Sequence, residues 1–337
     1  MKILKDYLFL GMISFSLVSL FSMCKKDSAT PLVGNWIEQS DFEGVARGDA
    51  AAFTIGNSGY VGTGYDGEDR LSDFWTYDAE RNNWTQVAEF PGQPRQGAVA
   101  FTAGGEGYVG TGYDGLVKYK DFYRYNPTSN SWHKVTAEFG GLARYGAVAF
   151  AIDDIGYVGT GFSGNAEKDF WAYNTSDSTW QQKTSYQSKV QDAVAFVIDG
   201  KGYITTGYSN GEYSKDFYMY DPANDSWTAK RKISNVSNEG YDDSYTIIRK
   251  KAAVFVLNGK AYITCGDIGN LKNDVWEYTP STDLWATRTS FEGTARTDAV
   301  GFATENGRGF VATGISSTLA FDDIWEFKPL EDFNEAD

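Results

Sequence analysis

The chain is poor in the residues that build metal centres, disulfide frameworks and catalytic triads. Of its 337 residues one is a histidine, His133, and two are cysteines, Cys24 and Cys265. A single histidine excludes metal sites built from several imidazoles and leaves one candidate base for a Ser-His-Asp triad. Two cysteines exclude a disulfide framework and a cysteine-rich metal cluster. We therefore expect no cofactor and no metal.

Proline and basic charge are also scarce. There are 7 prolines, and 30 basic residues stand against 45 acidic ones, a net charge of −15. Because a nucleic-acid binder needs a basic surface, nucleic acid is excluded as a partner. Glycine is abundant at 37 residues, as are aromatics, with 22 Tyr, 22 Phe and 10 Trp. This composition predicts an all-β chain of many short strands joined by tight turns.

The first residues are typical of an export signal. A short positive start precedes an apolar stretch at residues 7–21, which is too short for a comfortable membrane span. Cys24 follows, and this arrangement resembles a bacterial lipoprotein signal, in which the cysteine is acylated and becomes the first residue. Met23 departs from the small residue usual at that position. A plain secretory signal with a nearby cleavage site is the alternative.

The lipoprotein resemblance implies a signal peptide at residues 1–23, lipidation at Cys24 and a polar tether at residues 24–35. The start Cys24-Lys25-Lys26-Asp27 is also similar to signals that send some Gram-negative lipoproteins to the cell surface. Acyl chains on Cys24 would anchor the protein to the membrane. We expect an outer-membrane lipoprotein on the periplasmic or cell-surface face, with a monomeric folded part.

Three kinds of residue recur along the chain with a common period of about 48 residues. These are Trp36, Trp84, Trp132, Trp180, Trp227 and Trp285; Gly64, Gly112, Gly161, Gly207, Gly266 and Gly314; and Asp73, Asp121, Asp169, Asp216, Asp274 and Asp323. Each unit reads as four short strands, here called a to d, as in 98–101, 108–112, 121–125 and a strand at Trp132. Four strands in 40–50 residues are typical of a β-propeller blade.

These units resemble the kelch repeat over residues 36–328. The family is marked by a glycine pair closing strand b and by a Tyr and a Trp with six residues between them. Here the glycine pair reads Thr-Gly in five units and Cys265-Gly266 in the fifth, which we attribute to a need for small residues near the axis. The Tyr–Trp spacing occurs at Tyr77/Trp84, Tyr125/Trp132, Tyr173/Trp180, Tyr220/Trp227 and Tyr278/Trp285.

The sixth unit lacks its last strand, and the start of the mature chain supplies it. Residues 36–47 match residues 285–296 in their Trp, Phe-Glu-Gly and Arg positions. The N-terminal segment is therefore strand d of the last blade, and pairing it with the end of the chain removes two exposed sheet edges. We predict a six-bladed β-propeller at residues 36–329, followed by a tail at residues 330–337.

Several recurrent residues have a structural explanation. The Trp and Tyr rows are predicted to form the core between blades. The Asp row before strand c is predicted to cap a turn or to accept hydrogen bonds from backbone N–H groups. Cys265 is expected to be a small buried thiol, and His133 a surface or packing residue on an outer strand.

A row of arginines precedes strand a at the mouth, the end of the ring where the innermost strands begin. It reads Arg47, Arg95, Arg144, Val190, Arg249 and Arg296. Guanidinium groups bind carboxylates bidentately, and kelch domains that bind acidic peptides use arginines at this position. The row therefore predicts contacts to an anionic ligand. The alternative is a structural role, in which the arginines pair internally with Asp49 and Asp298, two positions further on, or hold neighbouring loops in place. Lys251 adds to the positive charge at the mouth.

The loops between strands b and c open at the same mouth and supply further candidate ligand residues, Tyr65, Tyr113, Phe162 and Tyr208. An insertion at residues 232–247 adds Tyr241 and Tyr245. Aromatic faces beside polar groups suit a sugar or a peptide. Long loops in compact folds are often functional.

Three functions fit this pattern. The first is a binding module for an anionic glycan or an acidic peptide or protein at the Arg- and Tyr-bearing mouth. The second is a scaffold subunit of an outer-membrane complex. The third is an enzyme similar to the six-bladed kelch mutarotase of sialic acid, with Glu167, Glu212 or Glu239 as candidate acid–base groups. The copper oxidases with kelch repeats are excluded by the single histidine. We favour the binding module.

Overall fold

The computed structural model describes residues 32–317 and 319–336, which form six four-stranded antiparallel sheets and two small hairpins. Blade 1 contains β2 (Ala51–Ile55), β3 (Ser58–Gly62), β4 (Phe74–Asp78) and β5 (Asn83–Val87). Blade 2 contains β6 (Val99–Ala103), β7 (Glu106–Gly110), β8 (Phe122–Asn126) and β9 (Ser131–Lys134). Blade 3 contains β10 (Val148–Ile152), β11 (Ile155–Gly159), β12 (Phe170–Asn174) and β13 (Thr179–Lys183). Blade 4 contains β14 (Val194–Ile198), β15 (Lys201–Thr205), β18 (Phe217–Asp221) and β19 (Ser226–Ala229). Blade 5 contains β20 (Ala253–Leu257), β21 (Lys260–Thr264), β22 (Val275–Thr279) and β23 (Leu284–Arg288). Blade 6 contains β24 (Val300–Ala303), β25 (Gly309–Ala312), β28 (Ile324–Asp332) and β1 (Val33–Glu38). The hairpins are β16 (Tyr208–Ser209) with β17 (Glu212–Tyr213) and β26 (Ile315–Ser316) with β27 (Leu319–Ala320).

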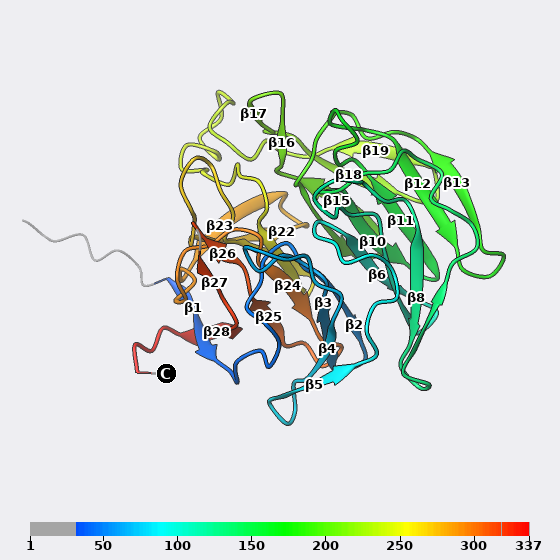
Figure 1. The fold of residues 1–337 in the computed structure, drawn as a ribbon. Helices are drawn as coiled ribbons and strands as arrows, with labels where there is room; N and C mark the ends of the chain where they lie inside the picture. The colour runs from blue at the N-terminus through cyan, green and yellow to red at the C-terminus, as the bar shows by residue number, and fades with distance from the viewer. Residues whose placement is uncertain (1–31, 318, 337) are drawn as a thin grey trace, which may run out of the picture. The chain divides into compact units, whose positions relative to one another are not determined.

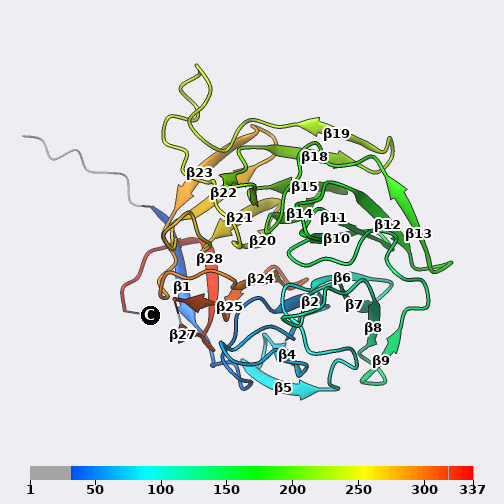
Figure 2. The ribbon, with the colours of Figure 1, turned by 45° about the horizontal axis from the view of Figure 1, so that its top comes forward.

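The six sheets stand around a central axis, each with its first strand innermost (Figures 1 and 2). The inner strands contact one another in the order β2, β6, β10, β14, β20, β24 and back to β2. The predicted all-β class and the six-bladed propeller are confirmed. No helix in residues 32–317 or 319–336 has the length and apolar character needed to cross a membrane. The predicted signal peptide and Cys24 lie outside the described residues.

The ring closes through β1, which pairs antiparallel with β28 as the sequence predicted. Trp36 lies opposite Phe327, is fully buried and packs its ring 5.0 Å from that of Phe291. The strands run further than the predicted boundaries. β1 begins at Val33, inside the predicted tether, and β28 ends at Asp332, inside the predicted tail.

Aromatic side chains fill the wedges between blades, which confirms the prediction for the Tyr and Trp rows. Tyr125 of strand c lies opposite Trp132 of strand d with ring centroids 5.0 Å apart. The Tyr125 hydroxyl donates to Asn130 Oδ1 in the intervening turn at 2.8 Å. The six residues between the Tyr and the Trp are therefore those that the tight c–d hairpin needs to place the two side chains opposite each other. Phe53 of strand a reaches the next blade, where a Cβ on Gly107 would lie 2.2 Å from its ring.

The Thr-Gly pair closing strand b joins neighbouring blades. Thr111 and Gly112 both have left-handed backbone, with φ of 60° and 99°. The Gly112 N–H donates at 2.7 Å to the carbonyl of Arg144, on the loop into the next blade. The same bond occurs in every blade, ending with Gly314 to Arg47. The positive φ explains the preference for glycine here, in addition to the small size that the sequence analysis invoked.

The two rare residues have structural roles. Cys265 is a free, fully buried thiol, and burial raises its pKa to about 12. Such a thiol is not a nucleophile at neutral pH. His133 lies on β9, an outer strand, with its side chain exposed. Both predictions are confirmed.

Candidate functional site

The arginine row lies buried beneath the mouth face. All five side chains have no exposed surface. Each guanidinium forms an ion pair with the aspartate that starts strand c of its own blade. The pairs are Arg47–Asp73, Arg95–Asp121, Arg144–Asp169, Arg249–Asp274 and Arg296–Asp323. The predicted turn-capping role of the Asp row is therefore replaced by pairing with arginine.

Arg144 shows how these groups are satisfied. Its Nη1 and Nη2 donate to the two oxygens of Asp169 at 2.5 and 2.8 Å. Nη1 also donates to the carbonyl of Thr160, and Nε to that of Leu142, each at 2.8 Å. The ring of Phe139 lies 5.0 Å from the guanidinium carbon. Four of the five N–H groups are thus engaged inside the protein.

These contacts contradict the predicted role of the arginines as ligand contacts. Burial would raise the pKa of Asp169, but the hydrogen bonds and charge of Arg144 hold that pKa below its usual value. A ligand carboxylate would have to displace an aspartate from a buried, bidentate pair. The arginines instead tie the loop between blades to both ends of the b–c loop, which holds the mouth in shape.

Blade 4 shows that the aspartate needs a partner even without arginine. Val190 replaces the arginine there. Lys232 Nζ donates to Asp216 Oδ1 and Ser188 Oγ to Asp216 Oδ2, both at 2.5 Å. Burial raises the pKa of Asp216, but the bonds from Lys232 and Ser188 outweigh it and lower the pKa overall. Each blade therefore pairs its aspartate, by different residues where the repeat is altered.

One residue from each blade narrows the mouth of the central channel. The six have left-handed backbone, with φ between 55° and 61°, and are Asp49, Gly97, Gly146, Asp192, Lys251 and Asp298. The N–H of each donates to the carbonyl of the one before it at 2.8–3.2 Å, and Asp49 to Asp298 closes the circle. This φ favours glycine and aspartate, which occupy five of the six positions; Lys251 is the exception. An alanine follows each, so the channel below is lined by small side chains.

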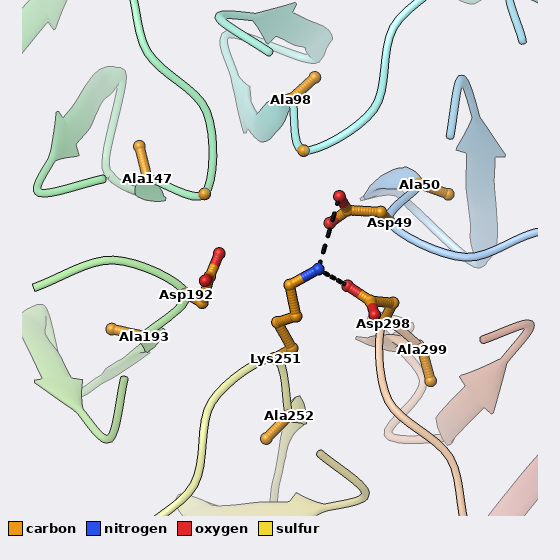
Figure 3. A pocket seen from close by; sticks show the side chains of 12 residues that line it. Asp49, Ala50, Ala98, Ala147, Asp192, Ala193, Lys251, Ala252, Asp298 and Ala299 are labelled. Atoms are coloured by element: carbon orange, nitrogen blue, oxygen red, sulfur yellow. Dashed lines mark hydrogen bonds and ion pairs between the residues drawn. The ribbon is translucent and has the colours of Figure 1, made fainter. Parts of the chain in front are cut away.

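The charge at the mouth is acidic and not basic as predicted. Asp49, Asp192 and Asp298 surround a cavity of about 120 Å³ into which Lys251 extends (Figure 3). Lys251 Nζ donates to Asp298 Oδ1 at 2.5 Å and lies 3.8 Å from Asp49 Oδ2. Asp192 accepts instead from Gln191 Nε2 at 2.9 Å. Three carboxylates thus face one ammonium, and neither Asp49 nor Asp298 pairs with an arginine in the part of the chain that the structure describes.

Burial changes the ionisation of this cluster. Burial raises the pKa of Asp298 to about 7, although Lys251 opposes the shift and Asp49 adds to it. Burial also raises the pKa of Asp192. The cost of holding these carboxylates ionised near neutral pH favours any further positive group that enters the mouth.

Aromatic residues begin the b–c loops of blades 1 to 4, whereas Asp267 and Ile315 stand at this place in blades 5 and 6. A backbone bridge ties the residue after each arginine position to the first residue of the b–c loop. The bridges relevant here are Gly48 with Tyr65, Gln96 with Tyr113, Tyr145 with Phe162 and Gln191 with Tyr208. All four predicted aromatics are partly exposed. The structure adds Tyr145, which lies between Tyr113 and Phe162 with ring centroids 5.3 and 5.5 Å away. Only its place after Arg144 in the repeat could have signalled it.

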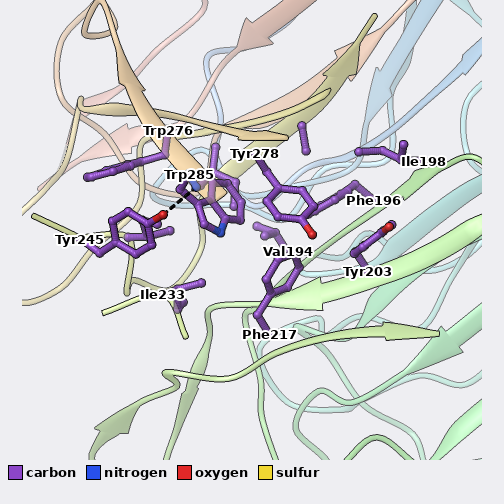
Figure 4. Packing of buried hydrophobic residues seen from close by; sticks show 13 residues of the cluster. Val194, Phe196, Ile198, Tyr203, Phe217, Ile233, Tyr245, Trp276, Tyr278 and Trp285 are labelled. Atoms are coloured by element: carbon purple, nitrogen blue, oxygen red, sulfur yellow. Dashed lines mark hydrogen bonds between the residues drawn. The ribbon is translucent and has the colours of Figure 1, made fainter. Parts of the chain in front are cut away.

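The insertion at residues 232–247, in the connection between blades 4 and 5, is a packing element. Tyr245, predicted as a ligand contact, is buried, and its hydroxyl accepts from the backbone N–H of Trp285 at 2.7 Å (Figure 4). Its ring lies 5.5 Å from that of Trp276, which corrects the prediction for this residue. Tyr241 is partly exposed with Arg231 stacked 4.7 Å from its ring.

The candidate acid–base residues of the enzyme hypothesis do not converge. Glu167 accepts from Ser163 Oγ in its own loop at 2.5 Å. Glu212 lies exposed on β17, and Glu239 is exposed in the insertion. None of the three lines the cavity at the mouth. In residues 32–317 and 319–336, no group of three or more His, Cys, Asp or Glu side chains is arranged to hold a metal ion.

Comparison with known proteins supports the fold. Residues 35–161 match the model of the KLHDC2/KLHL20/DRC7 Kelch-repeats domain. The chain is similar to the solved structure of YjhT, with a TM-score of 0.70 and 16% sequence identity, over 85% of this chain and 96% of that chain. At this identity the likeness concerns the fold alone. A search of curated proteins returned no match.

Proposed function

We propose that this six-bladed β-propeller, of which residues 35–161 match a Kelch-repeats domain, is a binding module whose mouth takes a positively charged group of a ligand. The observation that carries the proposal is the cluster of three carboxylates around Lys251. Its local excess of negative charge lies on a protein that is itself strongly acidic. The negative charge of the cluster and the negative charge of the whole protein both attract a cation toward the mouth.

The surroundings of the cavity favour an ammonium or guanidinium group of a peptide. Gly97 and Gly146 contribute no side chains to the ring, which leaves space opposite Lys251. A cavity of about 120 Å³ has room for a side-chain head group and its waters, but not for a whole oligosaccharide. Tyr113, Tyr145 and Phe162 would add attraction between a cation and their ring faces.

The alternatives have less support. An anionic ligand and a sialic-acid mutarotase both depended on accessible arginines, and these are buried in ion pairs. A scaffold role would use the sides of the propeller, and no feature of the mouth bears on it.

A thermal-shift assay of the full chain tests the proposal. The ligands are a lysine-rich and a glutamate-rich hexapeptide of equal length, and the variant is Asp49→Asn/Asp192→Asn. We expect the lysine-rich peptide alone to raise the melting temperature, an effect lost in the variant and reduced by salt. Asp78→Asn, which changes a partly exposed aspartate on blade 1, is the control. A shift with the glutamate-rich peptide, or an equal shift in the double variant, would refute the proposal.

We also propose that the propeller is tethered to the outer membrane through acylated Cys24, because the signal before it resembles that of lipoproteins. Cys24→Ala should move the protein from the membrane fraction to the soluble fraction. Mass spectrometry of the mature N-terminus should show acyl chains on the cysteine. An unmodified N-terminus at another residue would establish the plain secretory signal instead.

A further inference from the structure

A second cavity lies on blade 3, away from the mouth. It has a volume of about 370 Å³ and is lined by Ile155, Tyr157, Ala172, Asn174, Asp177, Thr179, Gln181 and Lys183. These residues share one face of β11, β12 and β13, and Asp177 belongs to the turn between strands c and d. That turn lies at the end of the blade opposite the b–c loops. The cavity, called here the blade 3 hollow, is therefore separate from the proposed site at the mouth.

The hollow exists because Ala172 occupies the middle of this face. Ala172 lies between Tyr157 on β11 and Gln181 on β13 in the strand register. At the equivalent position the other blades carry larger side chains, Thr76, Arg124, Met219, Glu277 and Glu326. A methyl group in place of these side chains leaves the centre of the face unfilled.

Three of the other blades fill the same space with ion pairs. In blade 2, Arg124 pairs with Glu106 at 3.0 Å. In blade 5, Glu277 pairs with Lys260 and Arg288 at 2.6 and 2.8 Å. In blade 6, Glu326 pairs with Arg308 and Lys328, each at 2.5 Å. Within the described residues, blade 3 has no such pair on this face, so its polar groups are directed to solvent.

The polar groups of the hollow balance in charge and alternate between donors and acceptors. Lys183 Nζ donates to Gln181 Oε1 at 2.8 Å, which leaves the Gln181 NH₂ group to donate outward. Asp177 Oδ1 accepts from the Thr179 hydroxyl at 2.7 Å, which leaves Asp177 Oδ2 as an acceptor. One acid and one lysine cancel, so the ligand needs no net charge.

From this arrangement we infer that the blade 3 hollow binds one neutral sugar residue of a glycan. Amide, carboxylate and ammonium groups complement the hydroxyls of a sugar, each of which both donates and accepts. The partly exposed side chain of Ile155, beside the nearly buried Ala172 and Tyr157, offers an apolar surface for the C–H face of the ring. The volume lies within the range of about 300–1,000 Å³ that is usual for small-ligand sites. The mouth and the hollow thus take chemically different ligands.

Saturation-transfer NMR and calorimetry on the full chain test the inference. The probes are the methyl glycosides of glucose, galactose, mannose and N-acetylglucosamine. Ala172→Met fills the hollow with the residue that blade 4 carries at this position. Thr76→Met places a methionine at the equivalent position of blade 1 and serves as the control. We expect at least one glycoside to bind the wild type and Thr76→Met equally, and to bind Ala172→Met at least tenfold more weakly. Gln181→Ala, which truncates an exposed side chain, should also weaken binding.

The outcomes separate this inference from the proposal for the mouth. The Asp49→Asn/Asp192→Asn variant should bind the glycoside as the wild type does. Loss of sugar binding in that variant would place the sugar at the mouth and overturn the inference. It is equally overturned when no glycoside binds the wild type at millimolar concentration, or when Ala172→Met, folded by its melting curve, binds unchanged.

Discussion

The buried arginine–aspartate pairs predict a large loss of stability when one arginine is removed. In Arg144→Met the methionine keeps most of the volume but none of the donors. Asp169 loses a bidentate partner, and the carbonyls of Thr160 and Leu142 each lose a hydrogen bond. Removing one member of a buried pair costs about 3–5 kcal/mol. At about 2 °C per kcal/mol for a domain of this size, we expect the melting temperature to fall by about 6–10 °C.

The pH dependence of this loss identifies its cause. Arg144 lowers the pKa of Asp169 in the folded state, so the pair contributes stability above the unfolded pKa near 4. That contribution is lost as the pH falls through the folded pKa. The difference between Arg144→Met and the wild type should therefore be full at pH 7 and should shrink in acid. Calorimetric melts at both pH values measure it.

Two further variants complete this test. Arg81→Met removes an exposed arginine paired with Asp78, and such surface pairs contribute about 0–1 kcal/mol, so this control should melt like the wild type. Arg144→Val/Leu142→Ser introduces the valine and the serine of blade 4, but not its Lys232, and the serine should recover part of the loss by donating to Asp169. Equal melting of Arg144→Met and wild type at pH 7 would refute the structural role of the arginines.

Three further predictions concern ring closure, the mouth and the buried thiol. Trp36→Ala removes a fully buried ring from the closing strand and should cost about 3–5 kcal/mol in urea unfolding, and a loss below about 1 kcal/mol would argue against closure by this strand. Burial raises the pKa of Asp298 to about 7, so this carboxylate is largely ionised at pH 8 and largely protonated at pH 6. A lysine-rich peptide should therefore bind more tightly at pH 8 than at pH 6, by up to about tenfold, and Asp298→Asn should remove this dependence. Tighter binding at pH 6 would contradict the prediction. In Cys24→Ser, Cys265 should react with Ellman's reagent only after denaturation, and rapid reaction of the native protein would show that the thiol is accessible.

The architecture was predictable because core positions repeat. The Trp, Gly and Asp rows indicated the six blades, and the match between residues 36–47 and 285–296 indicated the closing strand, which the pairing of Trp36 with Phe327 confirms. Such positions are set by packing within one repeat and between neighbours, and they leave a periodic trace. The boundaries at Val33 and Asp332 were missed because the paired ends extend beyond the repeat.

A structural role for the arginine row was one of the two readings that the sequence allowed, but the partner of each arginine was not predictable from one repeat position. Arg47 and Asp73 lie on different loops, and only the fold brings their side chains to 2.6 Å. A signal was present, since both rows recur in the same blades and Val190 interrupts one of them. The acidic residues of the mouth occur in the sequence as the repeated position that begins with Asp49. Their function could not be inferred, because the sequence does not show which repeated position faces the axis.

The blade 3 hollow illustrates the same limit. Ala172 is unremarkable as a residue in a strand. It becomes informative only when the equivalent positions of the other blades are placed on one sheet face, where larger side chains fill the space. Departures from a repeat are therefore better indicators of specific sites than the repeat itself, which reports on the fold.

A calorimetric titration tests the central claim, that the arginines hold the fold while the acidic mouth binds the ligand. The lysine-rich and the glutamate-rich hexapeptide are titrated into the wild type, Asp192→Asn and Arg144→Met, below the melting temperature of each. The account predicts binding of the lysine-rich peptide alone, weakened in Asp192→Asn and retained in Arg144→Met. Binding of the glutamate-rich peptide to the wild type, abolished in a folded Arg144→Met, would contradict it.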